Sequence, residues 1–263
     1  MLKIASWNIN SVRLRAATVA RFVAEARPDV LCLQEIKCRN GEFPAAAFKD
    51  MGLKHLHVVG QKGWHGVAIA SRVKLEPVAF ELCPRGEARA AVALIDGVEV
   101  HNLYVPAGAD VPDASVNPKF QHKLDFVEAM RVAYAARKGG APTVLVGDLN
   151  IAPGEFDVWS HKQLLDVVSH TPAETDGLNA VRAQGGFVDL ARLHKPDPEK
   201  LFTWWSYRSP DHTRNNRGRR LDHIWASADL ARVSQSEGFQ IHAPCRSWVK
   251  PSDHVPVVAA LKL

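Results

Sequence analysis

The sequence predicts an α/β protein in which two β-sheets pack face to face and helices cover their outer surfaces. Three observations favour this class. A strand, a helix and a second strand follow one another within residues 2–34, a run of strands extends from 54 to 104, and strand and helix patterns alternate again after residue 143. Because no low-complexity linker interrupts the chain, we expect a single domain over residues 1–263.

A β-α-β unit is expected at the start of the chain. Residues 2–8 have the pattern of a strand, and Asn10 or Ser11 is expected to cap the following helix. The helical spacing of apolar side chains continues through Val12, Ala16, Val19, Phe22, Val23 and Ala26. Pro28 then ends the helix, and residues 29–34 predict a second, apolar strand.

The strands between residues 54 and 104 predict antiparallel sheet. Asp96-Gly97 is a strong hairpin signal, because this dipeptide readily adopts the positive φ angles of a tight turn. It separates apolar runs at 91–95 and 98–100, which we expect to pair.

A longer helix and a second alternation of elements follow. The helix is expected to begin near Pro118 and to end at Gly139-Gly140. Its expected inward side chains are Phe120, Leu124, Val127, Met130 and Val132. Beyond it we expect a strand at 143–147, helical material from about 155 to 184, and strands near 187–191, 201–206, 221–227, 232–241 and 254–262.

Composition indicates an ordinary globular chain without a membrane anchor. Hydrophobic residues make up 46% and charged residues 23%, and no uncharged apolar run is long enough to span a bilayer. The N-terminus lacks a secretory leader pattern, so we expect a cytoplasmic protein. The four cysteines form no Cys-x-x-Cys pair, which favours a reducing compartment without structural zinc. Cys32 lies in an apolar run and should pack as a small hydrophobe.

The charge distribution favours a polyanionic partner. The formal net charge is +5 and the pI is about 9.1, although a modest basic excess is common in unrelated proteins. Against one acid, Asp211, the segment 208–220 carries five arginines: Arg208, Arg214, Arg217, Arg219 and Arg220. Aromatic side chains flank this segment: Trp204, Trp205 and Tyr207 before it, and Trp225 after it.

Asp148 and Asn150 form the most informative local pattern. They follow the apolar run 143–146, and strand alternation sends both to one side while Leu149 points into the core. A carboxylate and a carboxamide in this position can activate a water molecule or hold a metal ion. Alternatively, both side chains only hydrogen-bond the backbone of a turn, as these residue types often do.

Polar side chains also stand beside three other apolar runs: Asn8 and Asn10 after the first strand, Glu35 after the second, and Ser252-Asp253-His254 before the last. Hard divalent cations prefer carboxylate and carboxamide oxygens, and Mg²⁺ typically takes one or two carboxylates. Glu35, helped by Asn10 or Asp253, would suit such an ion. The alternatives are a helix cap at the asparagines, a solvated strand end at Glu35 and a turn with a hydrogen-bonded histidine at 254.

Seven ordered strings extend the argument over nearly the whole chain: SWNIN, LCLQEIK, GQKGWHGVA, NLYVP, VGDLNIAP, RGRRLDHIWAS and PSDHVPV. Together they resemble the exonuclease III family of abasic-site endonucleases, within the endonuclease/exonuclease/phosphatase superfamily. The resemblance implies a four-layer α/β sandwich of two mixed, mainly antiparallel sheets, with the catalytic residues at one edge of the paired sheets.

The resemblance also implies a metal site. Glu35 resembles the principal Mg²⁺ ligand, and Asn8, Asn10 and Asp253 resemble the groups that line the site. Mn²⁺ is expected to substitute for Mg²⁺.

The catalytic roles implied by the resemblance fit phosphodiester chemistry. Asp148 matches the carboxylate that activates or positions the attacking water, and Asn150 matches its orienting partner. Tyr104 matches a phosphate-contacting tyrosine, and His254 matches the histidine that binds the scissile phosphate. Asp222 would orient that histidine and favour its cationic form, or it could be a structural strand residue.

Contacts to DNA are expected from Trp204, Arg214, Asn216, Arg217, Arg219 and Lys62. Trp204 is favoured for the pocket that takes a base-less sugar, whereas Trp205 is assigned to the core. Two positions depart from the family pattern. Arg219 stands where relatives carry an apolar or aromatic pocket residue, and Ala107 stands where relatives often carry an amide.

The function implied is Mg²⁺-dependent DNA repair hydrolysis 5′ of abasic sites, with 3′ to 5′ exonuclease action and 3′ end cleaning. The expected partner is double-stranded DNA with abasic sites or blocked 3′ ends, and the expected state is a monomer. Two rival functions are a superfamily phosphatase for small phosphorylated molecules or lipids, and a non-catalytic DNA-binding repair scaffold. The intact catalytic set argues against the scaffold, and the string RGRRLDHIWAS argues against the phosphatase.

Overall fold

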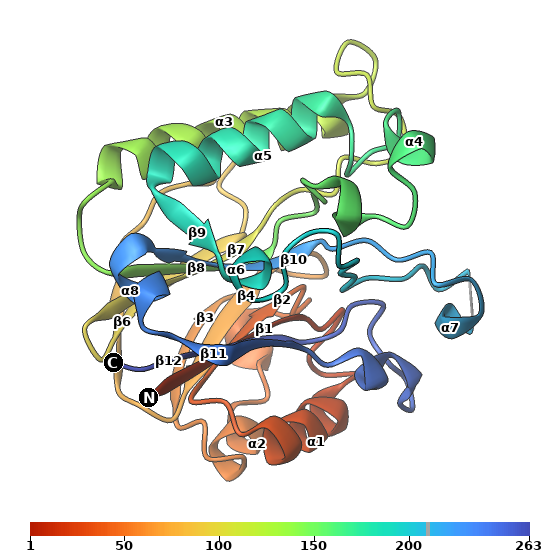
Figure 1. The fold of residues 1–263 in the computed structure, drawn as a ribbon. Coiled ribbons are helices and arrows are strands. Elements are labelled where there is room, and N and C mark those ends of the chain that lie inside the picture. Colours follow the sequence, from red (N-terminus) through yellow and green to blue (C-terminus); the bar gives the residue numbers. More distant parts are fainter. Residues whose placement is uncertain (209–210) are drawn as a thin grey trace.

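Two six-stranded sheets pack face to face in the computed structural model, which describes residues 1–208 and 211–263 (Figure 1). The first sheet has the order β11 (Ser234–Ile241), β12 (Val257–Leu261), β1 (Leu2–Asn8), β2 (Val30–Gln34), β4 (Val67–Ser71) and β3 (His55–Val59). The second has the order β5 (Leu75–Val78), β6 (Ala90–Ile95), β7 (Val98–Tyr104), β8 (Thr143–Asp148), β10 (Asp222–Ser227) and β9 (Phe187–Asp189).

Each sheet contains one parallel pair of strands, β1–β2 and β7–β8, and its other neighbours are antiparallel. A parallel pair needs a crossover connection, which helices provide here. The hairpin between β6 and β7 turns at Asp96 and Gly97 with φ angles of 50° and 79°, as the sequence predicts.

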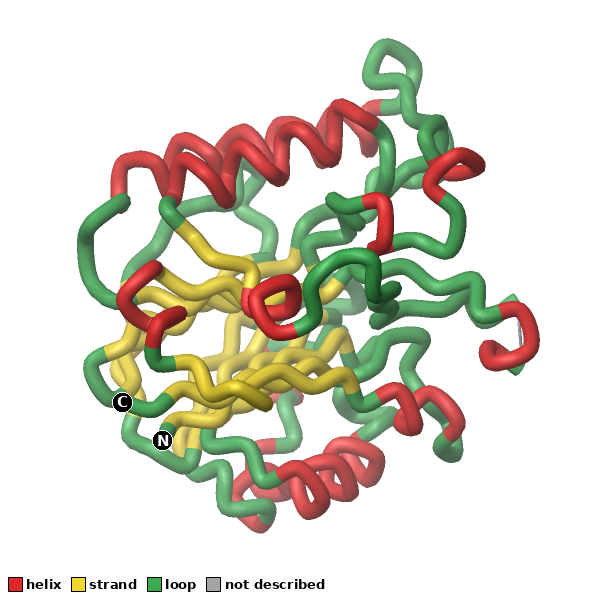
Figure 2. The backbone as a smooth tube through the Cα atoms, viewed as in Figure 1, coloured by secondary structure: helices red, strands yellow, loops and turns green. Residues whose placement is uncertain are grey.

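Helices cover both outer faces of the paired sheets (Figure 2). α1 (Ala16–Ala26) and α2 (Ala45–Asp50) lie on one face, and α3 (Pro118–Arg137) and α5 (Pro172–Gly185) lie on the other. The remaining helices are α4 (His161–Leu164), α6 (Leu190–His194), α7 (His212–Asn215) and α8 (Ala228–Arg232), of which α6 and α8 pack on the core between the sheets. The side chains of α1 pack with Trp7 and Leu33 of the first sheet, and those of α3 and α5 pack with Leu103 and Leu145 of the second.

The central core lies between the two sheets. Ile4 and Cys32 of the first sheet contact the same apolar cluster as Val100 and Val146 of the second, and all four are fully buried. The predicted four-layer α/β sandwich is therefore confirmed, and Cys32 packs as a small hydrophobe. Within the described ranges, no helix combines the length and apolar character that crossing a bilayer demands.

The first helix begins later than the sequence predicts. Asn10 and Ser11 do not cap it, because α1 starts at Ala16. Instead, the N–H of Ser11 donates to the carbonyl oxygen of Glu35 at 2.7 Å, and both Asn10 and Ser11 have positive φ angles. The segment after β1 is thereby held against the loop after β2, which places the polar side chains of both strand ends together.

The predicted strand at 201–206 is wrong. Its backbone forms only isolated bridges: Trp204 pairs with Arg219 on one side and with His254 on the other. Within the described residues, the partners of this segment are single bridged residues rather than strands, so no ladder forms. The strand predicted at 187–191 is shorter than expected, since α6 begins at Leu190.

Two inward positions predicted for the long helix are also wrong. Val132 of α3 is 55% exposed, and Leu124 is only partly buried. Phe126 and Tyr134 occupy the buried face instead. An apolar residue can still lie outside the buried face of a helix when its position in the chain does not match the helical repeat of that face.

A buried ion-pair network holds the segment before α4 against the start of β10. The Arg220 guanidinium donates two hydrogen bonds to Asp157, at 2.7 and 2.8 Å, and a third to Asp189 at 2.8 Å. Arg192 also pairs with Asp157. Burial raises the pKa of Asp157, but the two arginines outweigh burial and lower this pKa to about 2.

We predict that Asp157→Asn lowers the free energy of unfolding by about 3–5 kcal/mol at pH 7, because it leaves Arg220 buried without its bidentate partner. Urea unfolding would measure this. The folded-state pKa lies below the unfolded value, so the stabilisation is present above about pH 4 and is lost as the pH falls toward 2. A difference between wild type and variant that stays constant over this range would contradict the assignment.

Candidate active site

Polar side chains from several strand ends meet at one edge of the sandwich. Asn8 and Glu35 follow the parallel strands β1 and β2, and Tyr104 pairs in register with Asp148 at the ends of β7 and β8. Asp222 opens the antiparallel strand β10 opposite Asp148. Glu35, Tyr104 and Asp148 line a cavity of about 530 Å³, together with Asn150, Trp204, Arg219, Asp253 and His254.

Gly147 allows β8 to lie close to β7 just before Asp148, at the edge where the site forms. Its φ angle is 144°, and a Cβ atom at this position would overlap the carbonyl oxygen of Leu103 on β7. Only glycine permits this approach between the two strands. Leu149 is fully buried, as strand alternation predicts.

Asn8 connects the two sheets at the site. Its Nδ2 donates to Oδ2 of Asp148 at 2.9 Å and to Oε1 of Glu35 at 3.0 Å. Asn150 donates its own Nδ2 to the same Asp148 oxygen at 3.1 Å. The Asp148 carboxylate is thus oriented by two carboxamides, one from each sheet.

Burial and neighbouring charges control the protonation of the site. Burial and the charge of Asp222 raise the pKa of Asp148 to about 7, although His254 opposes this effect. Burial lowers the pKa of His254, but Asp222 and Asp148 outweigh it and raise this pKa to about 10. His254 Nδ1 lies 2.8 Å from Asp222 Oδ2, and its Nε2 lies 3.7 Å from Asp148 Oδ2. The histidine is therefore a buried cation between two carboxylates.

Glu35 and Asn10 already bind a cation, the ammonium group of Lys37. Lys37 Nζ lies 2.9 Å from Glu35 Oε2 and 2.6 Å from Asn10 Oδ1. The hydroxyl of Tyr104 donates to the other Glu35 oxygen at 2.7 Å. Asn10 Nδ2 donates to Asp253 Oδ1 at 3.2 Å, so Asp253 also belongs to this hydrogen-bonded cluster. Two oxygens that converge on an ammonium ion are also oriented to bind a hard metal cation, so these residues fit Mg²⁺.

A second group of side chains can also hold a metal. One ligand atom each from Asp148, Asp222 and His254 lies within 4.8 Å of the others, and Oδ1 of Asp222 is buried without a hydrogen-bond partner. This group includes an imidazole nitrogen, which is a poorer ligand for Mg²⁺ than carboxylate oxygen.

The predicted DNA contacts lie in different parts of the structure. Trp204 and Arg219 line the cavity, with the Arg219 guanidinium 5.5 Å from the Trp204 ring centre. Arg214 and Arg217 are exposed on and after α7, and Lys62 is exposed in the loop between β3 and β4.

The two other arginines of this segment differ: Arg208 is exposed and lines the cavity, whereas Arg220 is not available to phosphate, because it is buried in the ion-pair network. Trp205 is 5% exposed and Trp225 is 1% exposed, so both belong to the core. Their burial confirms the assignment of Trp205 to the core.

Known proteins share this fold and sequence along the full chain. The endonuclease/exonuclease/phosphatase family matches residues 5–254. An exodeoxyribonuclease III from Haemophilus influenzae is 30% identical, covering 99% of this chain and 100% of the relative. The chain belongs to the exonuclease III and AP endonuclease family.

Solved structures of this family have the same architecture. An AP endonuclease from Archaeoglobus fulgidus is 35% identical, with a TM-score of 0.92 and complete coverage of both chains. The 3′ phosphatase NExo from Neisseria, bound to a product DNA hairpin, is 31% identical with a TM-score of 0.89 and complete coverage of both chains.

The sequence patterns did not predict three charged side chains that lie near the site of this exonuclease III family member. Lys37 ends the string LCLQEIK, but a lysine after a strand is usually solvated, and only its distance from Glu35 reveals its contact. Arg89 donates to the carbonyl oxygen of Tyr104 and lies 4.8 Å from its ring centre. Lys123 is fully buried and pairs with Glu174.

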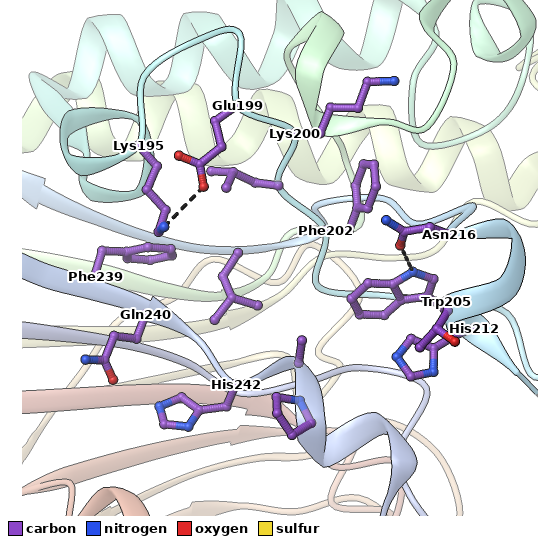
Figure 3. A pocket seen from close by; sticks show the side chains of 15 residues that line it. Lys195, Glu199, Lys200, Phe202, Trp205, His212, Asn216, Phe239, Gln240 and His242 are labelled. Carbon is purple, nitrogen blue, oxygen red and sulfur yellow. Dashed lines mark hydrogen bonds and ion pairs between the residues drawn. The ribbon is translucent and has the colours of Figure 1, made fainter.

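Asn216 lies beside a different cavity from the predicted catalytic groups. Its Oδ1 accepts a hydrogen bond from Trp205 Nε1 at 3.0 Å, and it borders a cavity of about 650 Å³ next to β11 (Figure 3). Lys195 and Glu199 form an ion pair at its rim. None of the residues that line this second cavity belongs to the predicted catalytic or metal-binding set.

We predict that Gly147→Ala lowers the free energy of unfolding by more than about 2 kcal/mol, because the new Cβ would push β7 and β8 apart. Gly41→Ala is the matched control, since a Cβ there has no neighbour within 4 Å. Chemical denaturation of both variants measures the difference. Equal stabilities would show that β7 does not approach Gly147 closely.

Proposed function

We propose that this protein is a Mg²⁺-dependent DNA repair hydrolase that cuts 5′ of abasic sites and trims or cleans 3′ ends, leaving a 3′ hydroxyl. The observation that carries the proposal is the convergence of Asp148, Asn150 and the Asp222-held His254 on one cavity that Glu35 and Tyr104 also border. Relatives named exodeoxyribonuclease III, AP endonuclease and 3′ phosphatase support the substrate class.

Hydrolysis requires an oriented water molecule and neutralised phosphate charge. Asp148, held by Asn8 and Asn150, would position the water and accept its proton. His254, kept cationic by Asp222, would donate a hydrogen bond to a non-bridging phosphate oxygen. Tyr104 would contact the same phosphate from the opposite wall.

The metal would be held by Glu35, with Asn8, Asn10 and Asp253 lining its site. When bound, Mg²⁺ supplies positive charge to the phosphate and to the departing 3′ oxygen. The exposed Arg214 and Arg217 would bind backbone phosphates of double-stranded DNA outside the cavity.

We predict that Asp148→Asn slows cleavage of an abasic duplex at least about 100-fold, because the carboxamide accepts no proton from water. Asp125→Asn is the matched control, since Asp125 is exposed on α3. A gel assay with Mg²⁺, with and without chelator, measures the rates.

Wild-type protein that hydrolyses an inositol phosphate but leaves abasic DNA intact would favour the phosphatase instead. Salt-dependent DNA binding without cleavage in any divalent metal would favour the scaffold. Retained cleavage by Asp148→Asn would overturn the mechanism.

We predict that Lys37→Met lowers the Mg²⁺ concentration that half-saturates thermal stabilisation, because Mg²⁺ then meets no competing ammonium at Glu35 and Asn10. Glu35→Gln should abolish most of the stabilisation. Lys49→Met, at an exposed position of α2, serves as the control. An unchanged Mg²⁺ response in Glu35→Gln would place the metal elsewhere.

A further inference from the structure

Arg219 is the less exposed of the two arginines, Arg208 and Arg219, that line the cavity with the predicted catalytic groups. The main chain of Trp204 bridges Arg219 on one side and His254 on the other. Arg219 and His254 are therefore separated by two strand spacings, roughly 10 Å between backbones. Both side chains line the same cavity.

Buried contacts hold this guanidinium in place. Arg219 Nη1 donates to the carbonyl oxygen of Val168 at 2.8 Å and to the hydroxyl of Ser169 at 2.7 Å. Ser169 has a φ angle of 86°, which is strained for a residue with a side chain. Its N–H is bound by both oxygens of Glu174, at 2.8 and 2.9 Å, and Glu174 pairs with the buried Lys123. The loop residue that Arg219 contacts, Ser169, is thus held by a fully buried ion pair between Glu174 and Lys123.

No carboxylate of the described residues lies within ion-pair distance of Arg219. Three of the four acids that line its cavity have other partners: Glu35 pairs with Lys37, Asp148 with Asn8 and His254, and Asp253 with Trp204 and Asn10. The fourth, Asp110, is exposed and forms no ion pair with Arg219. Its side chain is partly buried against the Trp204 ring. The charge of Glu174 acts on Arg219, but this carboxylate is already paired with Lys123. A half-buried cation that forms no ion pair within the described residues favours an anionic ligand beside it.

We propose that Arg219 is a specificity-determining residue that makes the cavity prefer a 3′-phosphomonoester end over an abasic phosphodiester. The inference rests on the proposed function. In a 3′-phosphate end the scissile phosphate has a terminal, charged oxygen where an abasic site has a bridging oxygen and a neutral sugar. Arg219 would bind the charged oxygen, whereas a sugar packed there would strip water from the guanidinium without replacing its hydrogen bonds.

The reaction at such an end is hydrolysis of a phosphate monoester. The water oxygen bonds to phosphorus, and the bond between phosphorus and the 3′ oxygen breaks. The 3′ oxygen keeps the electron pair and gains one proton, so the products are a 3′ hydroxyl and inorganic phosphate. No oxidant or co-reactant other than water takes part.

The test compares kcat/KM on two duplexes of the same sequence, one with a 3′-phosphate at a nick and one with an abasic site. Arg219→Leu is expected to lower the ratio of 3′-phosphate to abasic cleavage at least about tenfold, with the loss confined to the 3′-phosphate substrate. Arg219→Gln retains a donor for Val168 and Ser169 but no charge, and should lower the ratio similarly. Arg219→Lys should restore part of the preference.

Arg232→Leu is the matched control, because Arg232 is exposed on α8 and lies outside the cavity lining. Thermal unfolding of each variant shows whether it is folded. A ratio unchanged in both Arg219→Leu and Arg219→Gln would overturn the inference while leaving the proposed function intact. Wild-type protein that cleaves neither duplex would overturn the proposed function itself.

Discussion

The hydrogen bonds of Asn8 are the interaction on which the site depends. Asn8 ends a strand of the first sheet, yet its side chain binds Asp148 of the second sheet and Glu35 of its own. The backbone carbonyl of Asn8 accepts a hydrogen bond from Ser252, and Trp7 Nε1 donates to the carbonyl of His254. The relative position of the two sheets therefore sets the distance between Glu35 and Asp148, the groups proposed to bind the metal and to position water.

The electrostatic arrangement explains how three acids coexist in so small a volume. Asp148 and Asp222 share His254, which is cationic between them, while Lys37 neutralises Glu35. The carboxamides of Asn8 and Asn150 orient Asp148 without adding charge. This arrangement suits the proposed function, because cations remain near the cavity for a polyanion and because the Asp148 carboxyl, proposed to accept a proton from water, has a pKa raised to about 7.

Sequence patterns predicted the elements that depend on local spacing and failed where distant contacts decide. The Asp96-Gly97 hairpin and the burial of Leu149 follow from turn chemistry and strand alternation. The cap expected at Asn10 is absent because Ser11 instead binds the distant loop after β2.

Charge patterns in the sequence likewise did not show which charged side chains reach the site. Arg220 has the charge expected of a DNA contact, yet it is buried and forms ion pairs with two acids that are distant in the sequence. The contact of Lys37 with Glu35 and Asn10 similarly depends on side-chain positions that spacing alone does not define. Ordered motifs identified the groups that meet in the cavity, but only the folded chain distinguishes Arg219, which lines it, from its buried neighbour Arg220.

The most direct test of the central claim is a double-mutant cycle between Asp148→Asn and His254→Ala, measured as the single-turnover rate of abasic-duplex cleavage with Mg²⁺. If the two side chains act as one unit, the double variant will be about as slow as the slower single variant. Effects that multiply in the double variant would show that Asp148 and His254 act independently, and would contradict the account.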